Sequence, residues 1–363
     1  MNKKINILKK FDSIVGPFAI TFIKALFRPR INTCEKPSSF LFIRPGGIGD
    51  AVLLIPAIKK IKSAYPEAKI DLLCEKRNCE IFKLCEEINS IFLYDSLTGL
   101  KSAFRERYDA VIDSEQWYRL SALVAYLTRT PIRIGFATNN RKKLFNNPTS
   151  YKEDEHEIDS FFRLASALIP EPTFDEGSAF ISIPYEISKG IESHLKAVSE
   201  KRVVAIFPGG SVPEKRWPSG RFREVAERLT DAGYAIAAIG GKADSNLGDE
   251  ITKGLNSTVN LCGSLSLVET AALLKRAVLL ITGDSGILHI AFGVGTGTLS
   301  LFGPGNEIKW APKGEIHSIL SSAIDCRPCT KFGNIPPCKR ELECMSLISA
   351  TAVFEKAIKL LER

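Results

Sequence analysis

The chain has 363 residues, 45% of them hydrophobic and 25% charged, so it is long enough for two globular cores and is neither a disordered nor a fibrous protein. Its formal net charge of +8 suits acidic partners such as nucleotides, nucleic acid or an anionic membrane, although a modest positive charge also simply aids solubility. Nine cysteines are an odd number in a large chain that shows no cleavable secretory signal, so we expect a reducing cytoplasm and no disulfide scaffold.

Residues 1–35 form an amphipathic, basic N-terminal segment. Its longest uncharged stretch, residues 13–23, is far shorter than the ~20 residues that a spanning helix needs. The segment therefore either lies in the headgroup region of an anionic bilayer or packs as a helix on the protein's own surface, and the sequence favours neither. The apolar side chains available for insertion are Phe11, Ile14, Val15, Phe18, Phe22 and Phe27, flanked by Lys9, Lys10, Lys24, Arg28 and Arg30.

A regular alternation of strands and helices follows and predicts a first α/β domain over residues 36–190. Apolar runs predict buried strands over 40–44, 69–74, 90–95, 108–113 and 132–136, separated by helices such as 51–65 and 116–128. This order is typical of a doubly wound sheet.

The pattern restarts after a polar, proline-bearing stretch around residues 170–184, which predicts a second α/β domain over 191–345. Its expected strands are 202–208, 234–240, 258–262, 278–284 and 297–304. The C-terminal segment 346–363 reads as an amphipathic helix that closes the chain.

A glycine-rich loop, residues 44–50, follows the first strand of the first domain and opens a helix. Backbone N–H groups and the positive end of the helix dipole meet there, which suits an anion such as phosphate. The loop matches neither G-x-G-x-x-G nor a Walker A motif, so neither a dinucleotide dehydrogenase nor a P-loop NTPase is indicated. Its candidate residues are Arg44, Gly46, Gly47 and Asp50.

Three loops of the second domain also follow strands, where ligands of open α/β sheets bind. Residues 208–218 combine small residues with Lys215 and Arg216, which can neutralise phosphate charge. Asp244 follows the next strand and suits ribose hydroxyls. Residues 283–289 place a hydroxyl and backbone amides at a helix start, with His289 one turn inside. Since the glycine loops lie far apart in the sequence, we expect two α/β domains that face each other.

Taken together, residues 43–54, 208–211, 215–218, 283–289 and 301–304 resemble glycosyltransferase family 9, the ADP-heptose:lipopolysaccharide heptosyltransferases. The resemblance covers roughly residues 38–345, in the right order. It implies an α/β fold of the GT-B type, with two Rossmann-like doubly wound domains facing across a cleft. The first domain would bind the acceptor and the second the nucleotide sugar.

The resemblance implies an inverting, metal-independent transfer of a heptose or related sugar from an ADP-sugar to a lipopolysaccharide core acceptor. It implies a cytoplasmic enzyme, peripheral at the inner face of the inner membrane, whose partners are the donor, the acceptor and an anionic membrane surface but no nucleic acid. The exact sugar, base and acceptor stay open. Two alternatives remain: a GT-B nucleotide-sugar epimerase, and a non-catalytic protein that binds a nucleotide sugar or lipid.

By the same resemblance Asp50 is the general base, since an inverting displacement needs one carboxylate opposite the leaving group. The alternative is that Asp50 caps the helix that begins at residue 51. Lys215 would reach the diphosphate and Asp244 the ribose. The other donor-side residues implied are Gly209, Gly210, Ser211, Asp284, Ser285, Gly286 and His289; those on the acceptor side are Arg44, Gly46, Gly47 and His156.

Two of these residues have further interpretations. An inward-pointing Asp284 would repel a diphosphate, so we expect it to cap the helix that follows and to shape the loop. His289 either hydrogen-bonds the substrate or is a satisfied core residue, as histidines in apolar helices often are.

Four cysteines near the C-terminus, Cys326, Cys329, Cys338 and Cys344, can in principle hold zinc or an iron–sulfur cluster through four thiolates. Their spacing is looser than that of two C-x-x-C pairs, so reduced structural thiols or a disulfide pair are the alternative. Such a metal would brace the C-terminal segment, and the transfer itself is expected to require no cofactor.

Overall fold

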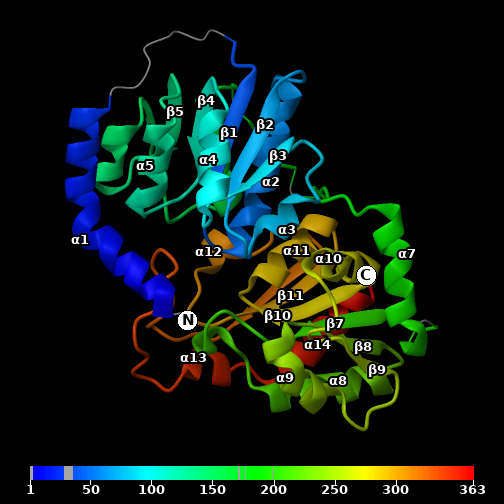
Figure 1. The fold of residues 1–363 in the computed structure, drawn as a ribbon. Helices are drawn as coiled ribbons and strands as arrows, with labels where there is room; N and C mark the ends of the chain where they lie inside the picture. Colours follow the sequence, from blue (N-terminus) through cyan, green and yellow to red (C-terminus); the bar gives the residue numbers. More distant parts are fainter. Residues whose placement is uncertain (1–2, 28–35, 171, 176, 199) are drawn as a thin grey trace. The chain divides into compact units, whose positions relative to one another are not determined.

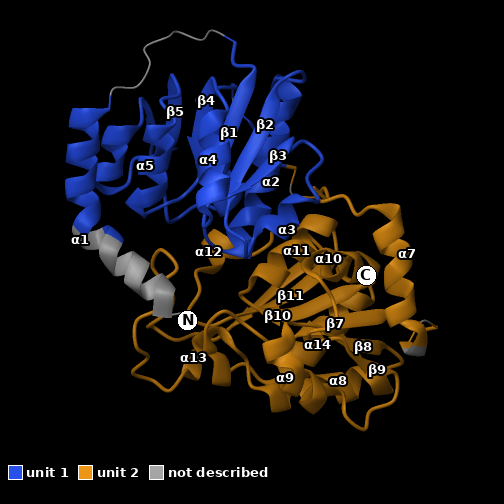
Figure 2. Cartoon of the chain, viewed as in Figure 1, with its two compact units in different colours: residues 1–174 blue, residues 175–363 orange. Residues whose placement is uncertain are grey.

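The computed structural model describes residues 3–27, 36–170, 172–175, 177–198 and 200–363; in its first helix, side chains are described at residues 12 and 15–27 (Figure 1). The chain forms two compact units, residues 1–174 and 175–363 (Figure 2). The chain passes from the first unit to the second between residues 174 and 175. Helix α7 (Tyr185–His194) follows and packs on α10 (Leu267–Arg276) of the second unit. The functional limits 36–190 and 191–345 stay predictions.

The first unit contains a six-stranded parallel sheet in the order β3-β2-β1-β4-β5-β6. Its strands are β1 (Ser39–Arg44), β2 (Lys69–Cys74), β3 (Ser90–Leu93), β4 (Ala110–Asp113), β5 (Ile132–Phe136) and β6 (Asn147–Thr149). The helices are α2 (Ile48–Ala64), α3 (Cys79–Phe82), α4 (Leu97–Arg105), α5 (Arg119–Leu127) and α6 (Glu157–Ala165), with a 3₁₀ turn η1 at Asn139–Leu144. The strand order reverses between β1 and β4, which is where such sheets bind ligands.

The second unit repeats this arrangement, in the order β12-β11-β10-β7-β8-β9. Its strands are β7 (Val203–Phe207), β8 (Ala235–Ala238), β9 (Thr258–Asn260), β10 (Leu279–Gly283), β11 (Gly297–Phe302) and β12 (His317–Ser321). Besides α7 and α10, its helices are α8 (Ser219–Asp231), α9 (Ser245–Thr252), α11 (Gly286–Val294), α12 (Glu307–Trp310), α13 (Glu343–Ser346) and α14 (Ala350–Leu361), with 3₁₀ turns η2 (Lys196–Val198), η3 (Pro213–Lys215) and η4 (Lys242–Asp244). The reversal falls between β7 and β10, so both doubly wound sheets are confirmed.

The central strands are buried on both faces, which explains why they read as continuous apolar runs and not as alternating ones. Residues 40–43 of β1 and 203–206 of β7 are at most 1% exposed. The C-terminal helix α14 packs on α8 and on strands β10, β11 and β12, and buries Val353, Ala357 and Leu361. The closing helix expected over 346–363 is observed over Ala350–Leu361 and belongs to the core of the second unit.

Helix α1 (Lys3–Leu26) packs on α5 and η1 of the first unit. The Asp12 carboxylate accepts hydrogen bonds from the backbone N–H groups of Arg119 and Leu120, at 2.7 and 3.0 Å. Ile20 is 1% exposed in the core of this unit. One face of the helix therefore packs on the protein itself. The side chains at 3–11, 13 and 14, and residues 28–30, of the predicted segment lie outside the described part. Within the described residues no helix is both long and apolar enough to cross a bilayer.

Candidate active site

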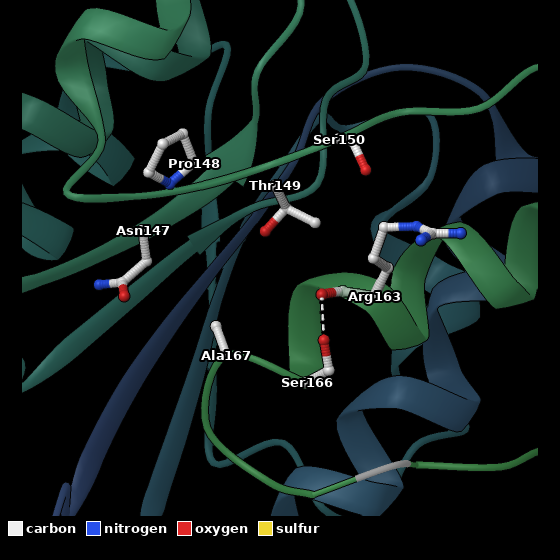
Figure 3. Close-up of a pocket in the computed structure, with 7 residues that line it drawn as sticks. All are labelled: Asn147, Pro148, Thr149, Ser150, Arg163, Ser166 and Ala167. Atoms are coloured by element: carbon white, nitrogen blue, oxygen red, sulfur yellow. Dashed lines mark hydrogen bonds between the residues drawn. The ribbon is translucent and has the colours of Figure 1, made fainter.

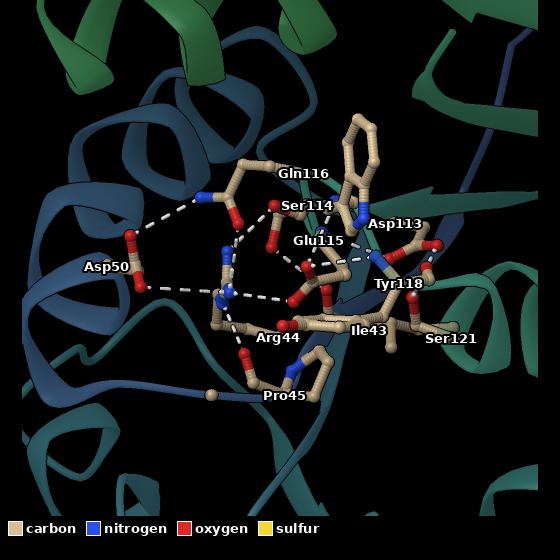
Figure 4. A network of polar contacts seen from close by, with 12 residues as sticks. Ile43, Arg44, Pro45, Asp50, Asp113, Ser114, Glu115, Gln116, Tyr118 and Ser121 are labelled. Atoms are coloured by element: carbon tan, nitrogen blue, oxygen red, sulfur yellow. Dashed lines mark hydrogen bonds and ion pairs between the residues drawn. The ribbon is translucent and has the colours of Figure 1, made fainter. Parts of the chain in front are cut away.

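A buried guanidinium lies at the strand-order reversal of the first unit. Arg44 ends β1 and is 1% exposed. Its guanidinium donates to the carbonyls of Pro45 and Ser114, both at 2.7 Å, and to the Glu115 carboxylate at 3.2 Å (Figure 4). Since Ser114 and Glu115 follow β4, Arg44 ties together the two strands between which the order reverses.

Asp50 points into this network from the first turn of α2 (Figure 4). Its carboxylate lies 3.8 Å from the Arg44 guanidinium and accepts a hydrogen bond from the Gln116 amide at 3.3 Å. The N-cap of α2 is Gly47, so the interpretation of Asp50 as the helix cap is wrong: the helix begins at Ile48, three residues earlier than expected. The side chain of Asp50 is 21% exposed, so a ligand can reach it.

Several carboxylates surround Arg44 in this network. Burial by itself lowers the pKa of Arg44, but the charges of Asp50, Glu115, Glu157 and Asp113 outweigh it and raise that pKa. Arg44 thus stays protonated and supplies the positive charge that lets several acidic groups lie together.

A second buried ion pair lies at the end of β4. Asp113 ends β4 and its carboxylate lies 2.5 Å from the Arg141 guanidinium, with both side chains fully buried. Burial raises the pKa of Asp113, and Arg141 opposes that rise. This pair fixes the end of β4, on which Ser114 and Glu115 are carried.

Gln116 was missed as a site residue by sequence reasoning, although it connects two acidic side chains. Its amide donates to Glu157 at 2.6 Å and to Asp50 at 3.3 Å. Glu157, which is fully buried, and Glu115 were missed too. The signal for Glu115 and Gln116 was their place directly after a predicted strand, since carboxyl ends of parallel strands meet at one sheet edge.

Asn78, which no pattern in the sequence singled out, holds the loop between β1 and α2. The Asn78 amide donates to the carbonyls of Arg44 and Gly46, each at 3.2 Å. Gly46 has a φ of +106°, and a Cβ there would lie 3.0 Å from the Arg44 guanidinium. Glycine is therefore required where the loop passes Arg44.

His156, predicted on the acceptor side, caps a helix. It is the N-cap of α6, 4% exposed, and its Nδ1 accepts from the Ile158 N–H at 3.4 Å. The following residue, Glu157, is the one that joins the network around Asp50.

A depression of about 300 Å³ lies elsewhere on the first unit, between β6 and α6 (Figure 3). It is lined by Asn147, Pro148, Thr149, Ser150, Arg163, Ser166 and Ala167. The Arg163 guanidinium is ion-paired with Glu155, and the Ser166 hydroxyl donates to the Arg163 carbonyl at 2.8 Å. This depression contains none of the predicted site residues.

In the second unit, Lys215 and Asp284 form an ion pair at the reversal between β7 and β10, with 2.5 Å between ammonium and carboxylate. The expectation that Asp284 caps the next helix is wrong. Ser285 is the N-cap of α11 and its hydroxyl accepts from the Leu288 N–H at 3.3 Å. Gly286 is the first residue of that helix. The side chain of Lys215 is 18% exposed and that of Asp284 is 7% exposed.

The glycine at the end of β10 makes this pairing possible. A Cβ on Gly283 would lie 2.6 Å from the carbonyl oxygen of Lys215, so the turn that carries Lys215 passes directly against the strand end. The neighbouring Arg216 is exposed and donates to the Gly210 carbonyl at 2.9 Å. Of the two cations predicted in this loop, Lys215 is therefore the one directed to Asp284.

Asp244 lies against the loop that follows β7 and contains Gly209. Its carboxylate accepts from the Gly241 N–H at 3.0 Å and is within 2.6 Å of a Cβ placed on Gly209. Gly209 is buried, Gly210 is partly exposed and Ser211 is exposed. The structure thus brings the loops after β7, β8 and β10 to one edge of the sheet, with Ser211 at its accessible side.

His289 is 3% exposed, and its Nδ1 has no hydrogen-bond partner among the described residues. Burial lowers its pKa to about 4; Asp284 opposes this shift and Lys215 adds to it. The ring makes an edge contact with Trp310 at 6.3 Å between centroids. His289 is therefore neutral at pH 7, and a contact to substrate stays a prediction.

This depressed pKa predicts a loss of stability in mild acid. An unfolded histidine titrates near 6.5 and therefore binds protons between pH 6.5 and 4 that folded His289 does not, so the free energy of unfolding falls as the pH falls through this window. We expect a loss of about 1–2 kcal/mol from this group by pH 5. Urea unfolding at pH 7 and 5 measures it. His289→Gln should reduce the difference by this amount and leave the part due to His317, whose pKa burial also lowers to about 4. An unchanged difference contradicts the assignment.

The eight described cysteines are unbonded, so the alternative of a disulfide pair among the C-terminal four is not seen. Burial raises the pKa of Cys344, and the nearby Cys338, Cys326 and Cys329 add to the rise, so these thiols lie in one region. In the described ranges no three histidine, cysteine or acidic side chains are grouped to hold a metal ion.

Two Rossmann-like units in one chain, each with its polar cluster at the strand-order reversal, form the GT-B fold. The family model for glycosyltransferase family 9 (heptosyltransferase) matches residues 98–339, more than half of the chain. The protein belongs to this family, which confirms the resemblance found in the sequence.

Lipooligosaccharide heptosyltransferase 2 of Haemophilus influenzae is 27% identical over 291 residues, which cover 73% of this chain and 83% of that relative. A glycosyltransferase family 9 structure from Veillonella parvula has a TM-score of 0.77 at 21% identity and covers 90% of this chain and 98% of its own. The ADP-heptose LPS heptosyltransferase II of E. coli has a TM-score of 0.73 at 21% identity, with coverages of 89% and 98%. The two solved structures share the fold with this chain.

Proposed function

We propose that this protein transfers a heptose or a related sugar from an ADP-sugar to a sugar of the lipopolysaccharide core, with inversion at the anomeric carbon. Family membership and the names of the similar proteins support the class of reaction. The observation that carries the proposal is the accessible carboxylate of Asp50 within the Arg44 network, together with the Lys215–Asp284 pair of the second unit.

Asp50 suits the role of general base because it is the accessible carboxylate of its network. Its side chain is 21% exposed, compared with 8% for Glu115 and 0% for Asp113. It lies in the first turn of α2, at the positive end of the helix dipole, and 3.8 Å from the Arg44 guanidinium. The Gln116 amide donates to Oδ1 of Asp50, and the Arg44 guanidinium lies 3.8 Å from Oδ2, so both contacts orient the carboxylate toward an acceptor hydroxyl.

Lys215 suits the diphosphate of the donor because its ammonium is held at the sheet edge beside an exposed hydroxyl and a helix start. A departing nucleoside diphosphate needs positive charge and hydrogen-bond donors, which Lys215, Ser211 and the amides of 209–211 and 285–286 provide. We assign Asp284 to holding Lys215 in place, and Asp244 to the ribose hydroxyls.

In the proposed step the acceptor oxygen attacks the anomeric carbon while its proton passes to Asp50. The bond from that carbon to the diphosphate breaks, and ADP leaves with the electron pair. A single displacement of this kind inverts the anomeric configuration. The base and the positive charge both come from this chain's own side chains, so the proposal assigns no cofactor to the reaction.

The acceptor of the proposed reaction is part of a lipid. We therefore place the protein in the cytoplasm, peripherally at the inner face of the inner membrane. Helix α1 and the net charge of +8 support contact with an anionic surface.

A panel of nucleotide sugars tests the donor. We expect isothermal calorimetry to show binding of ADP-heptose at least about tenfold tighter than that of UDP-, GDP- or CDP-sugars, because a base pocket discriminates through hydrogen bonds that the wrong base leaves unmade. Equal affinity for all four would contradict the assignment of an ADP-sugar.

A structural zinc or iron–sulfur cluster on Cys326, Cys329, Cys338 and Cys344 stays a separate prediction. Elemental analysis of the purified protein decides it. One metal site per chain that is lost in Cys326→Ser supports such a centre, and metal at background level rejects it.

A further inference from the structure

The described part of helix α1 has an attached face and an outward face. On the attached face, Ile20 is buried, Ile23 and Phe27 pack against the same cluster, and the Tyr126 hydroxyl donates to the Phe27 carbonyl at 2.9 Å. The Asp12 carboxylate is ion-paired with Arg119 at 3.2 Å. Helix α1 is therefore fixed to α5 along its described length.

The outward face carries a row of large apolar side chains. Phe18 is 75% exposed, Phe22 66% and Leu26 59%. They are spaced by four residues, so they lie one above the other on one side of the helix. We call these three residues the α1 ridge. Single exposed apolar residues are ordinary, but an ordered row on one helix marks a contact surface.

The surroundings of the ridge are positively charged. The three elements packed together here, residues 12–27, 119–130 and 139–144, contain one acidic residue, Asp12, which Arg119 neutralises. Exposed cations on them are Lys24, Arg129, Lys142 and Lys143. An apolar row flanked by cations without exposed acids is complementary to an anionic bilayer surface.

We infer that the α1 ridge inserts into the headgroup region of an anionic membrane and anchors the first unit there. This inference rests on the proposed function, because an enzyme whose acceptor is a lipid has to reach that acceptor at the membrane surface. Among the described side chains, the inference assigns membrane insertion to Phe18, Phe22 and Leu26. Phe27, which the sequence also offered for insertion, packs on the protein instead. Helix α5, which holds α1, begins shortly after Gln116, so the anchor is attached to the element next to the Asp50 network.

Vesicle flotation of the full chain tests the ridge. Vesicles of phosphatidylethanolamine and phosphatidylglycerol should carry the wild-type protein, and vesicles of phosphatidylcholine alone should carry far less. The double variant Phe18→Ser, Phe22→Ser should bind the anionic vesicles about tenfold or more weakly, because two inserted rings are lost. Lys24→Gln should weaken binding about fivefold, and added salt should weaken it further.

Leu97→Ser is the matched control, since Leu97 is 78% exposed on α4 of the same unit. It should bind vesicles like the wild type, and thermal unfolding should be the same for all three variants because the changed side chains are exposed. Ridge variants that float like the wild type, an equal loss in Leu97→Ser, or no binding by the wild type would each overturn the inference.

Activity separates this inference from the proposed function. The ridge variant should lose turnover on a membrane-embedded acceptor but keep wild-type turnover on a deacylated, water-soluble one. Loss on both acceptors would mean that the ridge supports the active site, which overturns a membrane role. A wild type that transfers to neither acceptor would refute the proposed function, while flotation would still report on the ridge.

Discussion

Asp50→Asn is expected to lower kcat for transfer by about 10²–10⁴-fold while donor affinity stays close to that of the wild type. The amide has the same size and still contacts Arg44 and Gln116, but it cannot take the proton of the acceptor hydroxyl. Steady-state kinetics with acceptor and calorimetry with donor measure the two effects separately.

The loss of one acidic group from a helix N-terminus has its own cost of about 0.3–1 kcal/mol in stability. Glu186→Gln is the control for this term, because Glu186 lies in the first turn of α7, away from the network. Near-normal turnover in Asp50→Asn would reduce Asp50 to a structural partner of Arg44.

Lys215→Ala is expected to weaken donor binding about tenfold to a hundredfold, since a charge-assisted contact to phosphate contributes about 1.5–3 kcal/mol. The change also leaves the Asp284 carboxylate, 7% exposed, without its cation and facing the diphosphate. The double variant Lys215→Ala, Asp284→Asn removes that repulsion and should recover part of the affinity.

Lys275→Ala, which changes an exposed lysine at the end of α10, controls for net charge and should bind the donor like the wild type. Calorimetric titration with ADP-heptose provides the affinities. Unchanged binding in Lys215→Ala would remove Lys215 from the donor site.

The two parallel sheets were predictable because most of their strands are apolar runs that end at glycine or small polar residues. Strands β6 and β12 were missed because they lack such an apolar run. β6 is Asn147-Pro148-Thr149, and the His317–Ser321 edge strand is only partly buried, so neither has a continuous apolar signal. Tertiary pairing at the sheet edge, and not local preference, makes them strands.

Site residues were predictable where they lie in a single loop with a recognisable local motif. The glycines before Asp50 and before Ser285 mark turns that local sequence specifies. Which residue caps α2 or α11 depends on the position of the first helical turn, and there the sequence-based boundaries differ by one to three residues. A shift of one residue makes Ser285 the N-cap of α11, where Asp284 was expected.

Contacts between distant segments could not be predicted in the same way. Glu157 meets Gln116, and Asn78 meets the carbonyls of Arg44 and Gly46, only because the strand order places β4 beside β1 and folds the later helices over this edge. No local pattern in the sequence distinguishes these side chains from ordinary surface glutamates and asparagines.

The requirement for an acceptor is the most direct test of the proposed transfer. ADP-heptose is incubated with the protein with and without a lipopolysaccharide core acceptor, and NMR follows ADP release and the anomeric configuration of the product. We predict that ADP appears only with acceptor, that the new linkage has the configuration opposite to that of the donor, and that Asp50→Asn slows the formation of both products by about 10²–10⁴-fold. Consumption of ADP-heptose without acceptor, or a product with retained configuration, would contradict it.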